Sequence, residues 1–166
     1  ALIASLLHLK EEEIEQMIAS EKSSDSIQAP AKIIIEEAGL CLLAAYLPSF
    51  FKQLDYLQNG RFKSKAFAMR AVRLLEYMAA GKRSHREYVL QLPKILCGFG
   101  VTEAFDTRSR FRKKEIKEAD DLLQSVIENW KGHKNTSIDG LRTSFLQRKG
   151  IVTETEQSWT LQVEKK

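Results

Sequence analysis

The sequence predicts a mainly α-helical domain with a small antiparallel β-hairpin at its C-terminal end. Between residues 37 and 149, apolar residues recur mostly at intervals of three and four, which is the period of amphipathic helices. After Gly150 the interval changes to two, in two short runs at 151–153 and 159–163 that flank a polar turn. A lone hairpin is marginally stable in water. The β-branched run at 32–36 is therefore the candidate third strand.

The first 31 residues differ in composition from the rest. Residues 1–19 carry apolar side chains at helical spacing around an acidic run, which predicts an N-terminal helical arm. Residues 20–31 combine Ser, Asp, Gln, Lys and Pro with one large apolar residue, which is typical of a linker. Residues 32–166 are expected to form the third unit, a helical domain that ends in the hairpin.

The apolar segment that follows the first strand predicts a central, buried helix. From about Glu37 the segment is apolar nearly all round, as expected for a helix without a solvent face. Pro48 lacks a backbone N–H, so it must begin a new helix or bend this one. A turn at Asn59-Gly60 then ends the unit.

A regular amphipathic helix follows. Ser64 is placed to cap its start and Gly81 marks its end, where a left-handed residue costs least. The face opposite its apolar stripe carries Lys65, Arg70 and Arg73. We expect these three cations to lie in solvent.

The next segment predicts short elements and then a long helix. Residues 88–90 suit a brief extended piece, and Pro93 opens a short helix that ends at Gly98. Residues 99–112 have weak periodicity and are expected to form a loop. A strong helical period then runs from about residue 113 to residue 131.

The corner at residues 130–150 carries several helix-terminating signals. Gly132 follows the last apolar position of the long helix, Thr136 and Ser137 offer hydroxyls to the first amides of the next one, and Gly150 closes it. The simpler interpretation is that the corner is a folding device, because such residues most often only cap.

The alternative is that this corner is a protein interface. Asn135, Arg142 and Arg148 would then present an exposed polar surface beside Trp130. Under this hypothesis, replacing Arg142 and Arg148 together weakens assembly with a partner and leaves the domain folded.

The charge is uneven along the chain. The formal net charge is +4, yet residues 61–117 alone contain 15 Lys/Arg against 5 Asp/Glu. This segment could bind an acidic protein or a nucleic acid, although its cations are not interleaved with stacking aromatics, which disfavours nucleic acid. No apolar run approaches the roughly 18 residues of a membrane span. Cys41 and Cys97 lie in apolar runs and suit reduced core residues of a cytosolic protein.

Motifs that carry chemistry are missing from the sequence. It has no glycine-rich phosphate loop, no nucleophile elbow and no HExxH pair. His8, His85 and His133 have no partner at ligand spacing. We therefore predict no catalytic residue, no cofactor and no metal. An enzyme whose site is assembled from residues without a linear pattern is a further alternative.

Six segments occur in an order that resembles a known family: EEAGLCLLAAYLPSFFKQL, RAVRLLEYMAAGK, LPKILCGFG, LLQSVIENW, KNTSIDGLRTSFLQRKG and WTLQVEKK. Together they resemble the C-terminal domain of the tape-measure proteins of contractile injection systems, the phage-tail-like particles of bacteria. The sequence departs from the family pattern at Glu37, where an Asn is usual, and at 98–100.

The resemblance implies a non-catalytic assembly protein. The parent protein would lie inside the growing tail tube and set its length, and this domain would fix one end of it to tail tube or baseplate proteins. The resemblance further implies a bacterial cytoplasmic protein that is incorporated into the particle, without a membrane partner. It predicts nothing about self-association.

Overall fold

The computed structural model describes residues 30–82, 87–106, 108, 110–130 and 135–165. The predicted N-terminal arm at 1–19, most of the predicted linker at 20–31, and Gly132 lie outside these residues. The described part is mainly helical with a small antiparallel sheet, so the predicted fold class is confirmed.

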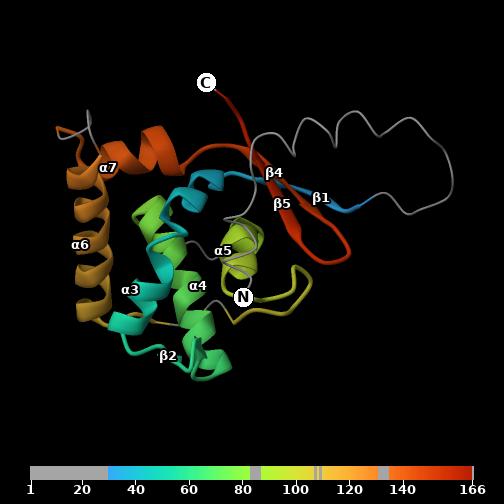
Figure 1. The fold of residues 1–166 in the computed structure, drawn as a ribbon, viewed down its shortest axis with the longest axis horizontal. Coiled ribbons are helices and arrows are strands. Elements are labelled where there is room, and N and C mark those ends of the chain that lie inside the picture. Colours follow the sequence, from blue (N-terminus) through green and yellow to red (C-terminus); the bar gives the residue numbers. More distant parts are fainter. Residues whose placement is uncertain (1–29, 83–86, 107, 109, 131–134, 166) are drawn as a thin grey trace, which may run out of the picture.

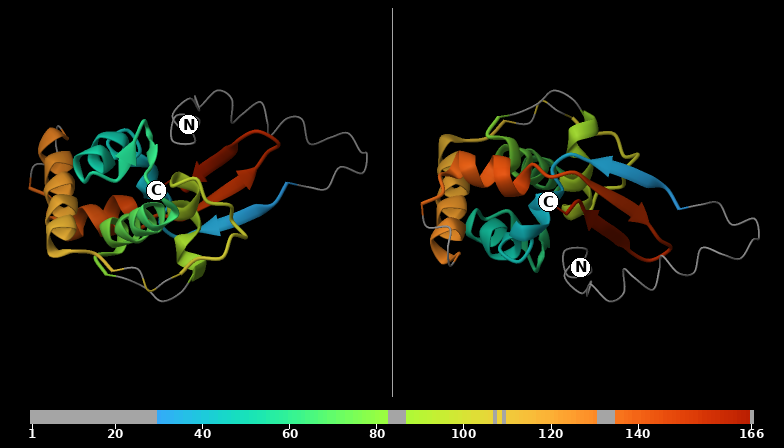
Figure 2. Two further views of the ribbon diagram at one scale, coloured as in Figure 1. Left: turned by 90° about the horizontal axis from the view of Figure 1, so that it is seen from below. Right: turned by 90° about the horizontal axis from the view of Figure 1, so that it is seen from above.

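The sheet has three strands in the order β1-β4-β5. Strand β4 (Gly150–Glu154) and strand β5 (Trp159–Val163) form the predicted hairpin. Strand β1 (Lys32–Ile35) pairs antiparallel with β4, which confirms the third strand. One face packs on the helical core, while the sheet itself extends away from the helices (Figure 2).

The segment after β1 is divided rather than forming one helix. A 3-10 helix, η1 (Ala38–Leu43), precedes the α-helix α3 (Leu47–Gln53). Pro48 lies in the first turn of α3, where the missing N–H costs no hydrogen bond, so it begins a new helix as predicted.

A small hairpin follows that the sequence analysis missed. Strands β2 (Leu57–Gln58) and β3 (Arg61–Phe62) are joined by the predicted turn at Asn59 and Gly60. Both turn residues have positive φ, 52° and 75°, which matches the twist of a two-residue hairpin loop.

Helix α4 (Lys65–Ala80) has the predicted limits, with Ser64 before it and Gly81 in the left-handed region after it at φ 71°. The prediction that Arg73 lies in solvent is wrong. Its side chain is 1% exposed, and its Nη1 lies 2.8 Å from Oε2 of the equally buried Glu76. Because α4 is the central helix and is packed on by α5, α6 and η1, this part of it has no free face.

The next elements are helical throughout. Residues 88–90, predicted as extended, belong instead to the 3-10 helix η2 (Glu87–Leu90), which leads directly into α5 (Gln91–Leu96). The reason is that Leu90 is fully buried in the core beside α4. This tertiary contact cannot be predicted from the local sequence pattern. Helix α6 (Lys113–Asn129) follows the predicted loop and is the predicted long helix.

The corner after α6 holds a short helix and a wider turn. Helix α7 (Ile138–Leu141) continues into η3 (Arg142–Leu146), a π-helical turn. The prediction that Gly150 closes this helix is wrong, because Gly150 is the first residue of β4. A Cβ there would lie 2.6 Å from Cβ of Ala38, so close packing against η1 requires the glycine.

The elements enclose one apolar core. Figure 1 shows α6 along one side of the molecule and the sheet along the other, with α3 and α4 between them. The fully buried aliphatic residues at the centre come from most of the elements: Leu40, Leu43, Leu47, Leu74, Leu75, Leu92, Leu123 and Leu146.

Candidate functional site

The two most distinctive sequence segments, 36–54 and 134–150, meet in a tight joint. The backbone N–H of Ala38 donates to the carbonyl of Arg148 at 2.8 Å. A Cβ on Gly39 would lie 1.8 Å from the carbonyl oxygen of Phe145. The backbones of η1 and η3 are therefore in direct contact, and only glycine fits between them at this point.

Beside this η1–η3 contact, Arg142 ties the start of η3 to α4, α6 and α7. It is 7% exposed, and its Nε donates to the carbonyl of Met78 at 3.1 Å while Nη2 donates to that of Tyr77 at 3.4 Å. Its charge is balanced by Asp139 at 2.9 Å and Asp120 at 3.6 Å. The predicted exposure of Arg142 is wrong, because its guanidinium donates to carbonyls at the C-terminal end of α4, that of Met78 and that of Tyr77, which also accepts from the N–H of Gly81.

Gln147 completes the same helix cap. Its Nε2 donates to the carbonyl of Ala79 at 3.0 Å. The hydroxyl of Tyr77 donates to the carboxylate of Asp120 at 3.1 Å, which ties α4 to α6 beside the guanidinium. The segment from 142 to 147 thus caps a helix distant in sequence, and we call this set of contacts between α4, α6, α7 and η3 the helix joint.

The other predicted interface residues lie around the helix joint. Trp130 is half-buried and packs edge-on against Phe145, with ring centroids 5.1 Å apart. Asn135 is exposed. Ser137 caps α7 as predicted, its Oγ accepting from the N–H of Gly140 at 3.0 Å.

Arg148 differs from Arg142 in its surroundings. It is half-buried, and its Nη2 is buried without a hydrogen-bond partner among the described residues. It borders a polar hollow of about 240 Å³ together with Lys149, Glu164 and Lys165. The structure therefore brings Trp130 and Arg142 to the helix joint and leaves Asn135 and Arg148 accessible to a partner.

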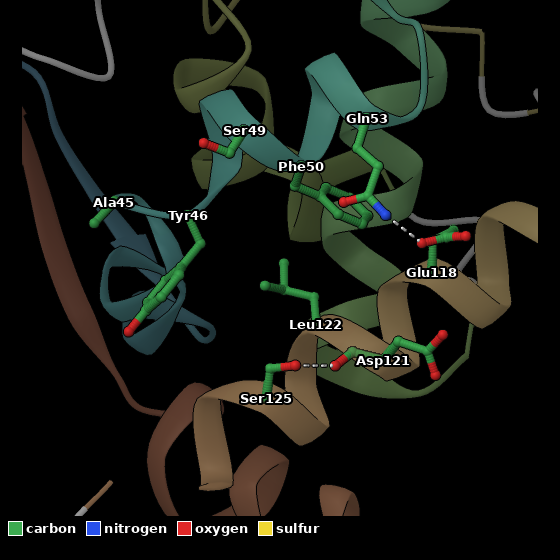
Figure 3. A pocket seen from close by; sticks show the side chains of 9 residues that line it. All are labelled: Ala45, Tyr46, Ser49, Phe50, Gln53, Glu118, Asp121, Leu122 and Ser125. Carbon is green, nitrogen blue, oxygen red and sulfur yellow. Dashed lines mark hydrogen bonds between the residues drawn. The ribbon is translucent and has the colours of Figure 1, made fainter. Parts of the chain in front are cut away.

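A second hollow, which the sequence analysis missed, lies between α3 and α6 (Figure 3). This α3/α6 groove has a volume of about 270 Å³. Its apolar surface comes from Tyr46, Phe50 and Leu122, and the amide Nε2 of Gln53 donates to Oε2 of Glu118 at 2.9 Å across one end. Tyr46 is 36% exposed, which is high for a large aromatic residue.

The exposed charges of α6 run against its helix dipole. Lys113 and Lys114 are exposed in the first turn, where the backbone already presents positive charge, and the last turn has Glu128 but no basic residue. Among the charged residues of the first turn, only Glu115 has the sign that the helix dipole favours. Its carboxylate accepts a hydrogen bond from the N–H of Arg112 at 2.7 Å and so caps the helix. The exposed charges at the two ends of α6 therefore do not stabilise the helix through its dipole.

Part of the basic segment 61–117 is paired within the described part of the domain. Lys94 is fully buried, and its Nζ donates to the carbonyls of Val101 at 3.1 Å and Glu103 at 2.6 Å. Six further cations of the segment have carboxylate partners within the 4.0 Å limit of an ion pair: Lys63 with Asp55, Lys65 with Glu103, Arg70 with Glu115, Arg73 with Glu76, Arg108 with Asp106, and Lys117 with Asp121. These contacts neutralise part of the segment, while Arg110, Arg112 and Lys113 are exposed.

The half-buried carboxyl group of Glu37 stands out among the titratable side chains. Burial, together with the nearby Glu76 and Glu36, raises the pKa of Glu37 to about 7. Its Oε2 is buried without a hydrogen-bond partner in the described part of the chain. Burial also raises the pKa of the free thiols of Cys41 and Cys97, which makes them poor nucleophiles.

The described ranges contain neither a metal-binding cluster nor a membrane-spanning helix. No group of three or more His, Cys, Asp or Glu side chains there is arranged to hold a metal ion. No helix there has both the length and the apolar content that crossing a bilayer requires.

Comparison with known proteins identifies the family. A family model described as contractile injection system tape measure protein matches residues 4–166. No curated protein and no solved structure matches the chain. Because the family match spans nearly the whole sequence, the chain belongs to the family of contractile injection system tape measure proteins, structural components of an assembled injection particle whose other proteins are their partners.

Proposed function

We propose that this chain is a terminal docking domain, which fixes one end of a tape-measure protein to a tail tube or baseplate protein during assembly. The observation that carries the proposal is the family match over residues 4–166 together with a folded, packed body in the described part. An α-helix rises about 1.5 Å per residue, so an extended helix spans far more length than the same residues packed together. A packed body suits an attachment point better than a ruler.

The proposed mechanism is binding without turnover. A docking domain must keep its surface in one geometry while the particle is built, which requires a stiff body. The helix joint supplies stiffness, because Arg142 and Gln147 tie the end of α4 to the segment that leads into the sheet. The buried polar groups of the helix joint are used in holding the domain together, which supports a non-catalytic role.

The proposed interface is the surface around this joint. Asn135 and Arg148 would contact the partner directly, and Trp130 would contribute the half-buried aromatic edge that protein interfaces favour. The guanidinium of Arg142 is already paired with Asp120 and Asp139, so Arg142 would not contact the partner. It would support the interface indirectly, by holding η3 in place.

The test is copurification of the full chain with the tube and baseplate proteins of the same particle. The double variant Asn135→Ala/Arg148→Ala should reduce the copurified partner about tenfold, a typical loss when polar interface anchors are truncated. Gln157→Ala/Arg110→Ala, which removes an exposed amide and an exposed arginine elsewhere, is the matched control and should bind normally.

Two results would contradict the proposal in different ways. If the wild-type chain captures no tube or baseplate protein, the docking function is wrong. If the double variant binds as well as the control, docking stands and this surface is wrong. Arg142 is unsuitable for the test, because its removal would unfold the helix joint and reduce binding for a structural reason.

A further inference from the structure

The α3/α6 groove is a surface that the fold leaves open. Tyr46, at 36% exposure, and the buried Phe50 line it on the α3 side, and the half-buried Leu122 lines it on the α6 side. Figure 3 shows Phe50 on α3, Tyr46 just before it, and Leu122 on α6. The lining residues span about two helical turns on each wall, Tyr46 to Gln53 and Glu118 to Ser125. An apolar floor between two helices is the usual receptor for the apolar face of a third helix.

The charged groups at the rim of the groove are acidic. Glu118 and Asp121 line it on the α6 side, and none of the described lining residues is a Lys or Arg. Asp121 is paired with Lys117 at 2.7 Å, but both side chains are more than half exposed. Exposed pairs of this kind contribute little, so a cation from a partner could replace Lys117 at small cost.

We propose that this groove binds an amphipathic α-helix of another particle protein, with apolar residues on Tyr46, Phe50 and Leu122 and with Lys or Arg facing Glu118 and Asp121. The inference deepens the proposed docking function and rests on it for the claim that the partner belongs to the particle. A helix fits better than a strand, because both walls are helices and offer no strand edge for pairing.

Charge complementarity selects a partner over the chain's own N-terminal segment. Residues 1–29 carry six Asp/Glu against two Lys/Arg, so their apolar positions are accompanied by charge of the same sign as the rim. Like charges at close range oppose docking and favour a different occupant.

The test is a photo-cross-link made during particle assembly. Tyr46 of the full chain is replaced by the aromatic photo-cross-linker p-benzoylphenylalanine, the assembling particle is irradiated, and the adduct is mapped by mass spectrometry. We expect an adduct on another particle protein, in a segment with apolar residues three and four apart and at least two Lys or Arg. An adduct on the same chain, on a second copy of it or on an acidic segment would overturn the proposal, as would no adduct.

A cross-linker at Asn135 separates this inference from the proposed function. If position 135 yields an adduct with a particle protein and position 46 yields none, the groove proposal alone fails. If neither position yields one, the groove proposal and the proposed surface around the helix joint both fail, while copurification decides on the docking function itself. The position is a fair comparison because Asn135 is exposed.

Charge reversal tests the acidic rim. With the cross-linker at position 46, Asp121→Lys should lower the adduct yield about fivefold, and Asp121→Asn should lower it less. Glu156→Lys makes the same change of charge at an exposed residue of the β4–β5 turn and should leave the yield within about twofold. Circular dichroism confirms that each variant is folded. Equal yields from Asp121→Lys and Glu156→Lys would overturn the proposal.

Discussion

The helix joint and the α3/α6 groove use similar residues in opposite ways. In the helix joint, Arg142 is buried, and its nitrogen atoms contact two backbone carbonyls and two carboxylates. In the groove, Tyr46 and Asp121 are exposed, and Asp121 has only a surface ion pair. The difference teaches that the strongest local sequence signals of this chain, at residues 130–150, belong to residues that hold the fold together. The groove is lined by residues of two family-like segments, 36–54 and 122–130, but nothing in their local pattern indicates that Tyr46 is exposed.

The same contrast separates two arginines six residues apart. Arg142 and Arg148 are indistinguishable by residue type, and both lie in the segment that resembles the family most closely. One closes the end of α4, while the other lines a surface hollow with an unsatisfied Nη2. Substitutions should therefore separate stability from binding, and the expected effects on stability fall in the following order.

The largest effect is expected for Gly39→Ala. The new Cβ would lie 1.8 Å from the carbonyl oxygen of Phe145, so the backbones of η1 and η3 must separate. We expect a loss of about 4 kcal/mol in the free energy of unfolding, measured by urea titration. Gly100→Ala is the control, since its nearest neighbour lies at 3.8 Å and its stability should stay within about 0.5 kcal/mol of the wild type. Equal stability of the two variants would refute the close contact.

Arg142→Met should have the next largest effect. It removes the side-chain donor to the carbonyl of Met78, removes one of the two donors to the carbonyl of Tyr77, and leaves Asp120 without its cation. We expect a loss of about 3 kcal/mol in the free energy of unfolding. Arg110→Met, at an exposed position, should change stability by less than about 0.5 kcal/mol. If Arg142→Met stays as stable as the wild type and loses partner binding instead, the contrast between the two arginines is wrong.

Glu37 gives the domain a pH dependence of definite sign. Its pKa is about 7 in the folded chain against 4.5 in the unfolded one, so the folded state retains the proton between these values. Its contribution to stability is therefore complete below pH 4.5 and is lost as the pH rises toward 7 and above. Glu37→Gln should match the wild type near pH 4.5 and exceed its free energy of unfolding by about 2 kcal/mol at pH 8. Parallel stability curves for the two proteins across this range would show that Glu37 ionises normally.

The smallest effect on stability is expected for Asn135→Ala/Arg148→Ala. Asn135 is exposed, and no hydrogen bond from the Arg148 side chain to a described residue is lost, so the free energy of unfolding should change by less than about 0.5 kcal/mol. Thermal unfolding measures this directly. A loss above about 2 kcal/mol would place Arg148 among the structural residues of the helix joint, together with Arg142.

Much of the architecture followed from local patterns. The period of two after Gly150 and the run Lys32–Ile35 predicted all three strands of the main sheet, and Ser64 and Gly81 bounded α4 correctly. The limits of α6 were found because a long periodic segment is a strong signal. The β2–β3 hairpin was missed because two-residue strands are too short to show an alternation.

The misplaced side chains have a common cause. Arg73 and Arg142 were predicted to be exposed because charged residues usually are. Both are buried because another element covers them and supplies carboxylates or carbonyls at bonding distance. The groove was missed for the converse reason, since Tyr46 belongs to a segment apolar on all sides and its exposure depends on how far α6 stands from α3.

The sequence by itself determined the helices, the sheet and the family, because periodicity, caps and turn residues act over a few neighbouring positions. Tertiary structure alone decided which arginine is structural, which carboxyl group holds its proton and where an apolar groove stays open. These properties depend on desolvation and on distances between elements far apart in the chain, such as α4 and η3, and a local pattern carries no information about either.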